Sequence, residues 1–134
     1  AHKNGKYFLY FPARDQQDIF RIGVAISNSP VGPFHAEAKP IEGSFSMDPA
    51  VFKDDNGAYY LYSGGIWGGQ LQRWTSGTYQ PEDVYPADDQ PALSAKIARL
   101  SDDMLQYAEA PRDVVILDQH GKPLLARDKK RRFF

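Results

Sequence analysis

The chain has 134 residues, of which 42% are hydrophobic and 13% aromatic, enough for one packed domain and too many for a disordered chain. Sixteen basic and seventeen acidic residues leave a net charge of -1, which excludes a whole-chain field that would gather nucleic acid or an anionic membrane and indicates a neutral partner. The absence of cysteine excludes disulfides and thiolate metal sites, whereas the compartment (secreted, periplasmic or cytoplasmic) stays open.

The chain begins with a predicted hairpin and a long strand. An Asn4-Gly5 turn precedes an aromatic run at residues 6–11. Residues 20–27 then alternate apolar with small or polar side chains, which is typical of a strand packed on both faces at Gly23. Residues 28–34 form a cluster of turn residues, so we expect the strand to end there.

A second predicted hairpin pairs residues 50–52 with residues 58–62. Its turn is Asn56-Gly57, for which we expect two residues at positive φ. Asp48 lies at the mouth of this hairpin, because Pro49 keeps the preceding residue out of the right-handed helical region and supplies no amide donor. The carboxylate is therefore placed to serve a cleft, or alternatively it only caps a turn.

The sequence repeats itself. Residues 4–11 match residues 56–63 at an offset of 56 minus 4, or 52, which is near the blade length of a β-propeller. Residues 24–29 resemble residues 98–103 at an offset of 98 minus 24, or 74, so we expect an insertion of 74 minus 52, or 22 residues, within the irregular stretch 64–91. Residues 93–105 have a helix-compatible composition, but the repeat favours a strand ending at residues 101–103, and we predict an all-β protein.

We expect two repeat units, at residues 1–43 and 44–134, that form part of a larger domain. The first unit has three residues before its Asn-Gly turn where the second has a strand, and the sequence stops on two aromatic residues. Two blades cannot close a propeller or cover their edges. The alternative is a small two-sheet sandwich.

One family matches these motifs. Its second carboxylate motif resembles Ser46-Met47-Asp48-Pro49-Ala50-Val51-Phe52 followed by Asp54-Asp55-Asn56-Gly57 and Tyr59-Tyr60-Leu61. The family is glycoside hydrolase family 43, whose members are five-bladed β-propellers, and residues 5–10 and 23–34 resemble the second blade of its β-xylosidases and α-L-arabinofuranosidases. The resemblance extends to about residue 113. It implies a second blade at 1–43 lacking its first strand and a third blade at 44–134 with the insertion 64–91 and an incomplete C-terminal segment.

The resemblance also implies a reaction. Family members use a general base, a general acid and a third carboxylate, because inversion requires an acid on the leaving oxygen and a base that holds water on the opposite face. Asp48 matches the third carboxylate by position, and it would orient the acid and raise the pKa of that acid by like-charge repulsion. The implied enzyme is an inverting exo-glycosidase that acts on xylosidic or arabinofuranosidic bonds of plant cell-wall polysaccharide.

The other two carboxylates are expected outside this chain. The base would precede Ala1. Glu109-Ala110-Pro111 superficially resembles the Glu-Gly-Pro type of acid motif, but the Gly-Tyr-Tyr-Leu hairpin that should follow is absent. Related enzymes have their acid directly after a segment like Arg132-Phe133-Phe134. The isolated chain is therefore predicted to be inactive.

Aromatic residues are the candidate sugar-binding side chains. Trp67, in the glycine-rich part of the insertion, and Phe45, close to Asp48, could stack on a sugar ring or fill the core. For Trp74 core filling is the favoured interpretation. The alternative for the whole protein is a non-catalytic carbohydrate-binding or structural propeller segment.

No cofactor or metal is assigned from the sequence. The histidines His2, His35 and His120 share no ligand spacing, so we expect no zinc site. Some family members hold a metal ion on the propeller axis, but its usual histidine ligand belongs to a blade not represented here. Residues 127–132 contain five basic side chains and one acidic side chain, Asp128, so their local net charge is 5 minus 1, or +4. Such a run indicates either phosphate binding or, more commonly, a solvated loop. The expected partners are a xylo- or arabino-oligosaccharide and the remaining blades, with neither nucleic acid nor membrane.

Overall fold

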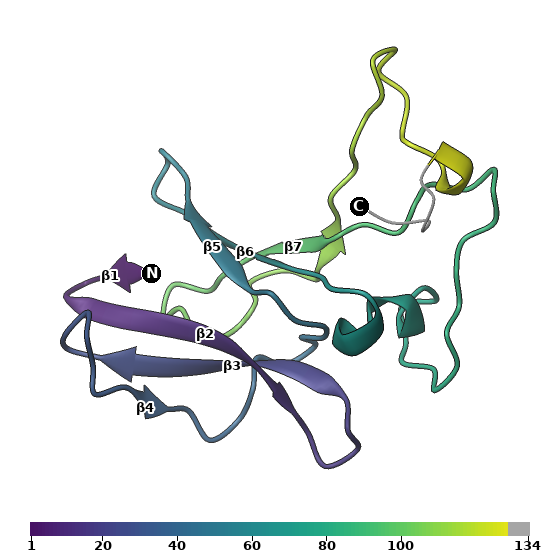
Figure 1. Ribbon diagram of the computed structural model, residues 1–134. Coiled ribbons are helices and arrows are strands. Elements are labelled where there is room, and N and C mark those ends of the chain that lie inside the picture. Colours follow the sequence, from purple (N-terminus) through teal and green to yellow (C-terminus); the bar gives the residue numbers. More distant parts are fainter. Residues whose placement is uncertain (129–134) are drawn as a thin grey trace.

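The computed structural model describes residues 1–128 and contains two antiparallel sheets of four strands each (Figure 1). The predicted all-β class is confirmed for these residues, since their helices are 3₁₀ turns of three residues each. Within the same range no helix has the length and apolar character needed to span a membrane. Residues 129–134, which include most of the basic run and the segment Arg132-Phe133-Phe134, lie outside the described part.

The first sheet lies within residues 1–43. Its strands follow the chain order: β1 (His2–Lys3), β2 (Lys6–Arg14), β3 (Phe20–Ser27) and β4 (His35–Ala36). The predicted turn is confirmed, because Asn4 and Gly5 have φ of 50° and 73°. The strand predicted at 20–27 is β3, and a Cβ at Gly23 would lie 2.6 Å from the Phe11 ring. Glycine is therefore what lets this ring lie against β3.

The second sheet begins with the predicted hairpin and then departs from its expected turn. Its strands are β5 (Ala50–Lys53), β6 (Tyr59–Ser63), β7 (Lys96–Arg99) and β8 (Arg112–Asp113). The expectation of two positive φ values at the turn is wrong, since only Gly57 has one, at 86°. Gly57 N donates to Asp54 O at 2.9 Å, and Asp54 N donates to Ala58 O at 2.8 Å. The two aspartates before Asn56 lengthen the loop, so a turn of the ordinary hand forms first and only the final glycine is left-handed.

A long connection separates β6 from β7. It covers residues 64–95, which is 95 minus 63, or 32 residues, and it includes η1 (Trp67–Gly69) and η2 (Leu71–Arg73). The register corrects the predicted repeat by one residue: Leu9 pairs with Ala25 and Leu61 with Ala98, so the offset is 98 minus 25, or 73, in place of 74. The strand predicted to reach residues 101–103 ends as β7 at Arg99, and the helix alternative at 93–105 does not form.

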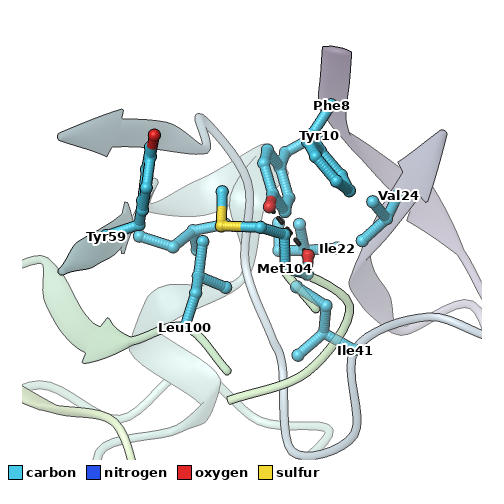
Figure 2. Packing of buried hydrophobic residues seen from close by; sticks show 9 residues of the cluster. Phe8, Tyr10, Ile22, Val24, Ile41, Tyr59, Leu100 and Met104 are labelled. Carbon is cyan, nitrogen blue, oxygen red and sulfur yellow. Dashed lines mark hydrogen bonds between the residues drawn. The ribbon is translucent and has the colours of Figure 1, made fainter. Parts of the chain in front are cut away.

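One hydrophobic core joins the two sheets (Figure 2). Buried side chains from both sheets, from the segment between them and from the connection after β7 meet in it: Phe8, Tyr10, Ile22, Val24, Ile41, Tyr59, Leu61, Leu100 and Met104. Burial of each large aliphatic side chain stabilises the fold by roughly 1.5–3 kcal/mol. Two tyrosines add hydrogen bonds across the sheets: Tyr10 Oη donates to Met104 O at 2.8 Å, and Tyr59 Oη donates to His2 O at 2.6 Å. The core therefore fixes how the two sheets face each other.

Candidate functional site

The segment that links the two sheets ends at Asp48. Its beginning is fixed to β3 by the buried Ser44, whose hydroxyl accepts a hydrogen bond from Ile22 N (3.0 Å) and donates one to Ile41 O (2.6 Å). Arg21 Nη1 also donates to Ser44 O at 3.0 Å. The segment is therefore bound to the first sheet before it reaches Asp48 and enters β5.

Asp48 has an unusual backbone and an unpaired side chain. Its φ is 56° and that of Ser46 is 69°, so both residues are left-handed. This conformation costs residues other than glycine on the order of 1–3 kcal/mol, and such residues cluster at functional sites. Asp48 is exposed, and no hydrogen bond or ion pair of its carboxylate forms within residues 1–128. The expectation that Asp48 lies outside the right-handed helical region is confirmed, and a role limited to capping a turn lacks the hydrogen bond it requires.

Trp67 lies at the start of η1 with its side chain half-exposed (51%) and its φ at 54°. Its backbone N donates to Oε1 of the buried Gln72 at 2.8 Å. Gln72 Nε2 in turn donates to Asp83 Oδ1 at 3.2 Å, and Arg73 Nε donates to the same oxygen at 3.0 Å. These hydrogen bonds, that of Arg73 first, hold the pKa of Asp83 below its usual value. The backbone of the Trp67 turn is thus held by Gln72 and Asp83, while the Trp67 ring lies at the surface.

Gln70 attaches the same turn to the first sheet. Its φ is 66° and its side chain is buried. The side-chain amide hydrogen-bonds to the backbone of the first sheet: Phe20 N donates to Oε1 at 2.9 Å, and Nε2 donates to Asp18 O at 2.8 Å. The teal 3₁₀ turns accordingly lie near the start of β3 in Figure 1. The long connection of the second sheet is therefore anchored on the first.

Phe45 and Trp74 form an aromatic stack beside this segment. Their ring centroids lie 4.5 Å apart with an interplanar angle of 18°. The Tyr79 ring meets Trp74 edge-on at 5.6 Å, and the Arg21 guanidinium lies 5.4 Å from the Trp74 ring centroid. Trp74 Nε1 is buried without a hydrogen-bond partner among the described residues. Trp74 thus has the packing role favoured from the sequence, and Phe45 is covered by it on one face.

Other carboxylates considered from the sequence have structural contacts. Glu109 Oε1 accepts a hydrogen bond from Arg99 N at 3.1 Å and lies 3.4 Å from Arg112 Nη1. It therefore links β7 to the segment before β8, which agrees with the absence of the acid motif around it. Asp54 lies in the hairpin loop, where Oδ1 accepts a hydrogen bond from Asp55 N at 2.9 Å.

Within residues 1–128 no group of three or more histidine, cysteine or acidic residues could hold a metal ion, so no residue of this part is assigned to an axial metal. A hollow of about 420 Å³ is lined by residues 75, 86, 90–94, 96, 113–116 and 123–124. Neither Asp48 nor Trp67 lines it, so it is separate from the candidate site.

Sequence reasoning missed the residues that hold the site together. Gln70 and Gln72 fall in the stretch 64–91 that the sequence marks only as irregular, although both are buried. Ser46 is also buried, with its hydroxyl against Gly65. The signal that could have found them is a pair of glutamines at alternate positions directly after a run of glycines, since such a tight backbone needs amide partners.

Comparison with known proteins settles the family. The sequence profile of glycosyl hydrolases family 43 matches residues 1–125. The chain belongs to this family. A Bacteroides ovatus protein named xylosidase/arabinosidase is 55% identical over 132 residues, covering 98% of this chain and 41% of that protein. A β-xylosidase of Xylanibacter ruminicola is 48% identical over 133 residues, covering 99% of this chain and 42% of that protein.

Solved family 43 structures agree with this assignment. The enzyme from Xanthomonas citri complexed with xylose has a TM-score of 0.92 and 54% identity, over 100% of this chain and 41% of that one. A β-xylosidase/α-arabinofuranosidase from a compost microbial metagenome, in complex with xylotriose, has a TM-score of 0.91 and 58% identity, over 100% of this chain and 42% of that one. The chain thus spans about two fifths of the length of these relatives, and the resemblance stated from the motif around Asp48 is confirmed.

Proposed function

We propose that the full-length protein is an inverting exo-glycosidase that hydrolyses xylosidic or arabinofuranosidic bonds of plant cell-wall polysaccharide. The proposal rests most on Asp48, an exposed carboxylate without a partner in residues 1–128 that is held in a left-handed turn beside the Trp67 turn. The names of the relatives supply the substrate class, since they refer to xylosidase and arabinosidase activity.

We further propose that residues 1–43 and 44–134 are the second and third blades of a five-bladed β-propeller. In support, Leu9 in β2 is 48% exposed whereas Leu61 at the matching place in β6 is 1% exposed. A preceding blade would cover Leu9 as the first sheet covers Leu61.

Asp48 would act on the general acid without exchanging a proton with the sugar. In the inverting reaction the base removes a proton from water while the water oxygen attacks the anomeric carbon, and the acid gives its proton to the departing glycosidic oxygen. Asp48, as a negative charge near that acid, would raise the pKa of the acid and keep it protonated. The base and the acid would come from other parts of the full-length protein.

Trp67 and Phe45 would contact the sugar. The half-exposed ring of Trp67 offers an apolar face of the kind that packs against a pyranose or furanose. Phe45 is partly buried, with one face on Trp74, so it would form the wall between Asp48 and the first sheet.

The test is Asp48→Asn in the full-length protein, with Asp54→Asn as a matched control. Both changes remove one negative charge next to β5, but Asp54 is partly buried and belongs to the hairpin loop. Asp48→Asn should lower kcat on aryl xylosides or arabinofuranosides roughly 100-fold or more with little change in KM, because the side chain acts on proton transfer. Asp54→Asn should keep parental kinetics.

The same assay separates the alternative function. A parental protein that binds xylo-oligosaccharides without hydrolysing any of these substrates would identify a non-catalytic carbohydrate-binding propeller. Parental turnover in Asp48→Asn would show that the role proposed for Asp48 is wrong.

A further inference from the structure

The Met47 side chain lies between two glycines of the Trp67 turn. A Cβ at Gly65 would lie 2.8 Å from Met47 Cγ, and a Cβ at Gly69 would lie 2.7 Å from the same atom. Neither glycine has a positive φ, so the backbone at these positions permits other residues. Met47 is the nearest neighbour at both positions, and Asp48 Oδ2 at 3.0 Å from the Gly65 Cβ and Ser46 Oγ at 3.3 Å from the Gly69 Cβ limit the space further.

Hydrogen bonds fix the backbone around Met47 as well. Met47 O accepts a hydrogen bond from Gly64 N at 2.9 Å. The buried Ser46 hydroxyl accepts one from Gly65 N at 2.7 Å and donates one to Gly65 O at 3.1 Å. Left-handed residues lie on either side of Met47, so we expect a displacement of Met47 to move the Asp48 backbone.

On its other side Met47 contacts the end of η1. Gly69 N donates to Ile66 O at 3.2 Å, and Gln70 N donates to Trp67 O at 3.0 Å, so Gly69 and Trp67 belong to one tight turn. That turn is anchored through the Gln70 side chain. A change at Gly69 is therefore passed to Trp67 on one side and to Met47 on the other.

We propose that Met47 is a positioning residue that locks the Asp48 turn to the Trp67 turn, so that the carboxylate and the sugar-binding ring keep one relative placement. This proposal rests on the function proposed above for Asp48 and Trp67. Methionine adapts readily to irregular gaps, but here glycine backbones close the space on two sides. The lock matters because a displacement of about 1 Å can cost an enzyme on the order of 100-fold in rate.

The test is Gly69→Ala in the full-length protein, with Gly68→Ala as a matched control. A Cβ at Gly68 has no neighbour within 4 Å, and its φ is not positive, so the two variants add the same methyl group one residue apart. Gly69→Ala should lower kcat at least about tenfold and raise KM. Gly68→Ala should stay within about twofold of the parent. Equal kinetics for the two variants would overturn the lock.

A second measurement separates positioning from loss of folded protein. In an Asp48→Asn background, Gly69→Ala should lower the residual kcat no further, because the carboxylate that it displaces is already absent, while it should still raise KM through Trp67. Independent, multiplying losses of kcat would mean that Gly69→Ala acts by general damage, and this would overturn the proposal.

Met47→Ala provides a variant that adds no clash, in case Gly69→Ala does not fold. It should also lower kcat and raise KM, because the Asp48 turn then has empty space beside it. Parental turnover in Asp48→Asn would refute the role proposed above for Asp48. If Asp48→Asn loses activity while Gly69→Ala and Met47→Ala both match Gly68→Ala, only the role of Met47 is refuted.

Discussion

The matching strands β2 and β6 bury opposite faces. Leu9 and Leu61 occupy the same place in the repeat, yet their side chains are 48% and 1% exposed. Tyr10 and Tyr62 match in the same way, and here the first is buried while the second is partly exposed. Since side chains alternate between faces along a strand, each sheet has one face in the shared core and one face outside it.

This difference indicates that each repeat unit is a sheet suited to packing between two neighbouring sheets. Both units place large apolar or aromatic side chains on both faces, although two sheets can cover only the two faces that meet. Repeat units that bury their cores by stacking need a neighbour on each side. The Leu9 face of the first sheet and the Tyr62 face of the second are therefore where we expect further blades.

The two units also differ in the connection after the second strand. The first sheet closes it with residues 15–19, whereas the second uses residues 64–95. The short turn is completed by the Gln70 amide from the long one. The repeat thus supplies the scaffold twice, and the added residues of the second unit supply the Trp67 turn.

The largest effect should come from Leu61→Ala and Leu9→Ala in the full-length protein. Leu61→Ala removes a buried side chain and should cost about 2–5 kcal/mol of unfolding free energy. If a further blade covers the first sheet, Leu9→Ala should cost a similar amount. Urea unfolding of both variants, with Val31→Ala at a 91% exposed turn position as the control, measures this.

A change below about 0.5 kcal/mol for Leu9→Ala, equal to that of Val31→Ala, would break the comparison. It would mean that the Leu9 face is solvent-exposed in the full-length protein and that the first sheet has only one neighbour.

The next effect is that of Tyr10→Phe, with Tyr62→Phe as its counterpart in the repeat. Tyr10→Phe leaves the buried Met104 carbonyl without its donor and should cost about 1–3 kcal/mol. Tyr62 makes no hydrogen bond through its hydroxyl within residues 1–128, so Tyr62→Phe should change stability little. Chemical denaturation of the two variants tests the pair. A larger loss for Tyr62→Phe would show that another part of the protein binds its hydroxyl.

A smaller effect should appear at alkaline pH. Burial, with Asp103 and Tyr59 adding to it, raises the pKa of Tyr10 above its ordinary value, and burial raises the pKa of Tyr107 to about 12. The folded protein therefore keeps protons that the unfolded chain releases near pH 10, and unfolding free energy should fall as the pH rises beyond that point. Tyr10→Phe should flatten this fall in a pH series of unfolding measurements. An unchanged slope would mean that Tyr10 is not buried in its neutral form.

Local patterns predicted much of the fold. Alternation around Gly23 predicted the bounds of β3, and Asn4-Gly5 predicted a two-residue turn, because both depend only on neighbouring residues. The same reasoning failed at Asn56-Gly57, where two preceding aspartates lengthen the loop. It also gave an offset of 74 residues between the third strands of the two units, whereas the strand pairing gives 73. Register depends on which face is buried, and the sequence of one repeat does not contain that information.

The candidate site was predictable only where one motif contains it. Asp48 and Trp67 could be found from Pro49 and from the glycine-rich run. Their connection through Met47 and Gln70 could not, because it depends on contacts between segments that are distant in the sequence. A polar residue in such a loop is indistinguishable from a solvated one until its partners are known.

The smallest expected effect is a difference between the short connection, residues 15–19, and the long connection, residues 64–95, in how much each contributes to the loss of stability at acidic pH. Burial alone would raise the pKa of Asp15, but hydrogen bonds from Ile19 N, Arg21 and Gln17 N outweigh it and lower the pKa. Asp83 in the long connection also has a lowered pKa, through its bonds from Arg73 and Gln72. Both carboxylates therefore stabilise the fold above their unfolded pKa of 3.8, and this contribution is lost as the pH falls through their folded values.

Asp15→Asn should reduce that acid loss more than Asp83→Asn, because two of the Asp15 bonds come from backbone amides that close the short turn. Both effects should be small, since surface ion pairs contribute little. Asp83→Asn should instead raise KM slightly, because Gln72, which binds Trp67 N, loses a charged partner. Unfolding midpoints at neutral pH and near pH 3, together with KM, test both expectations. An equal acid response with unchanged KM in Asp83→Asn would show that the long connection holds Trp67 without help from Asp83.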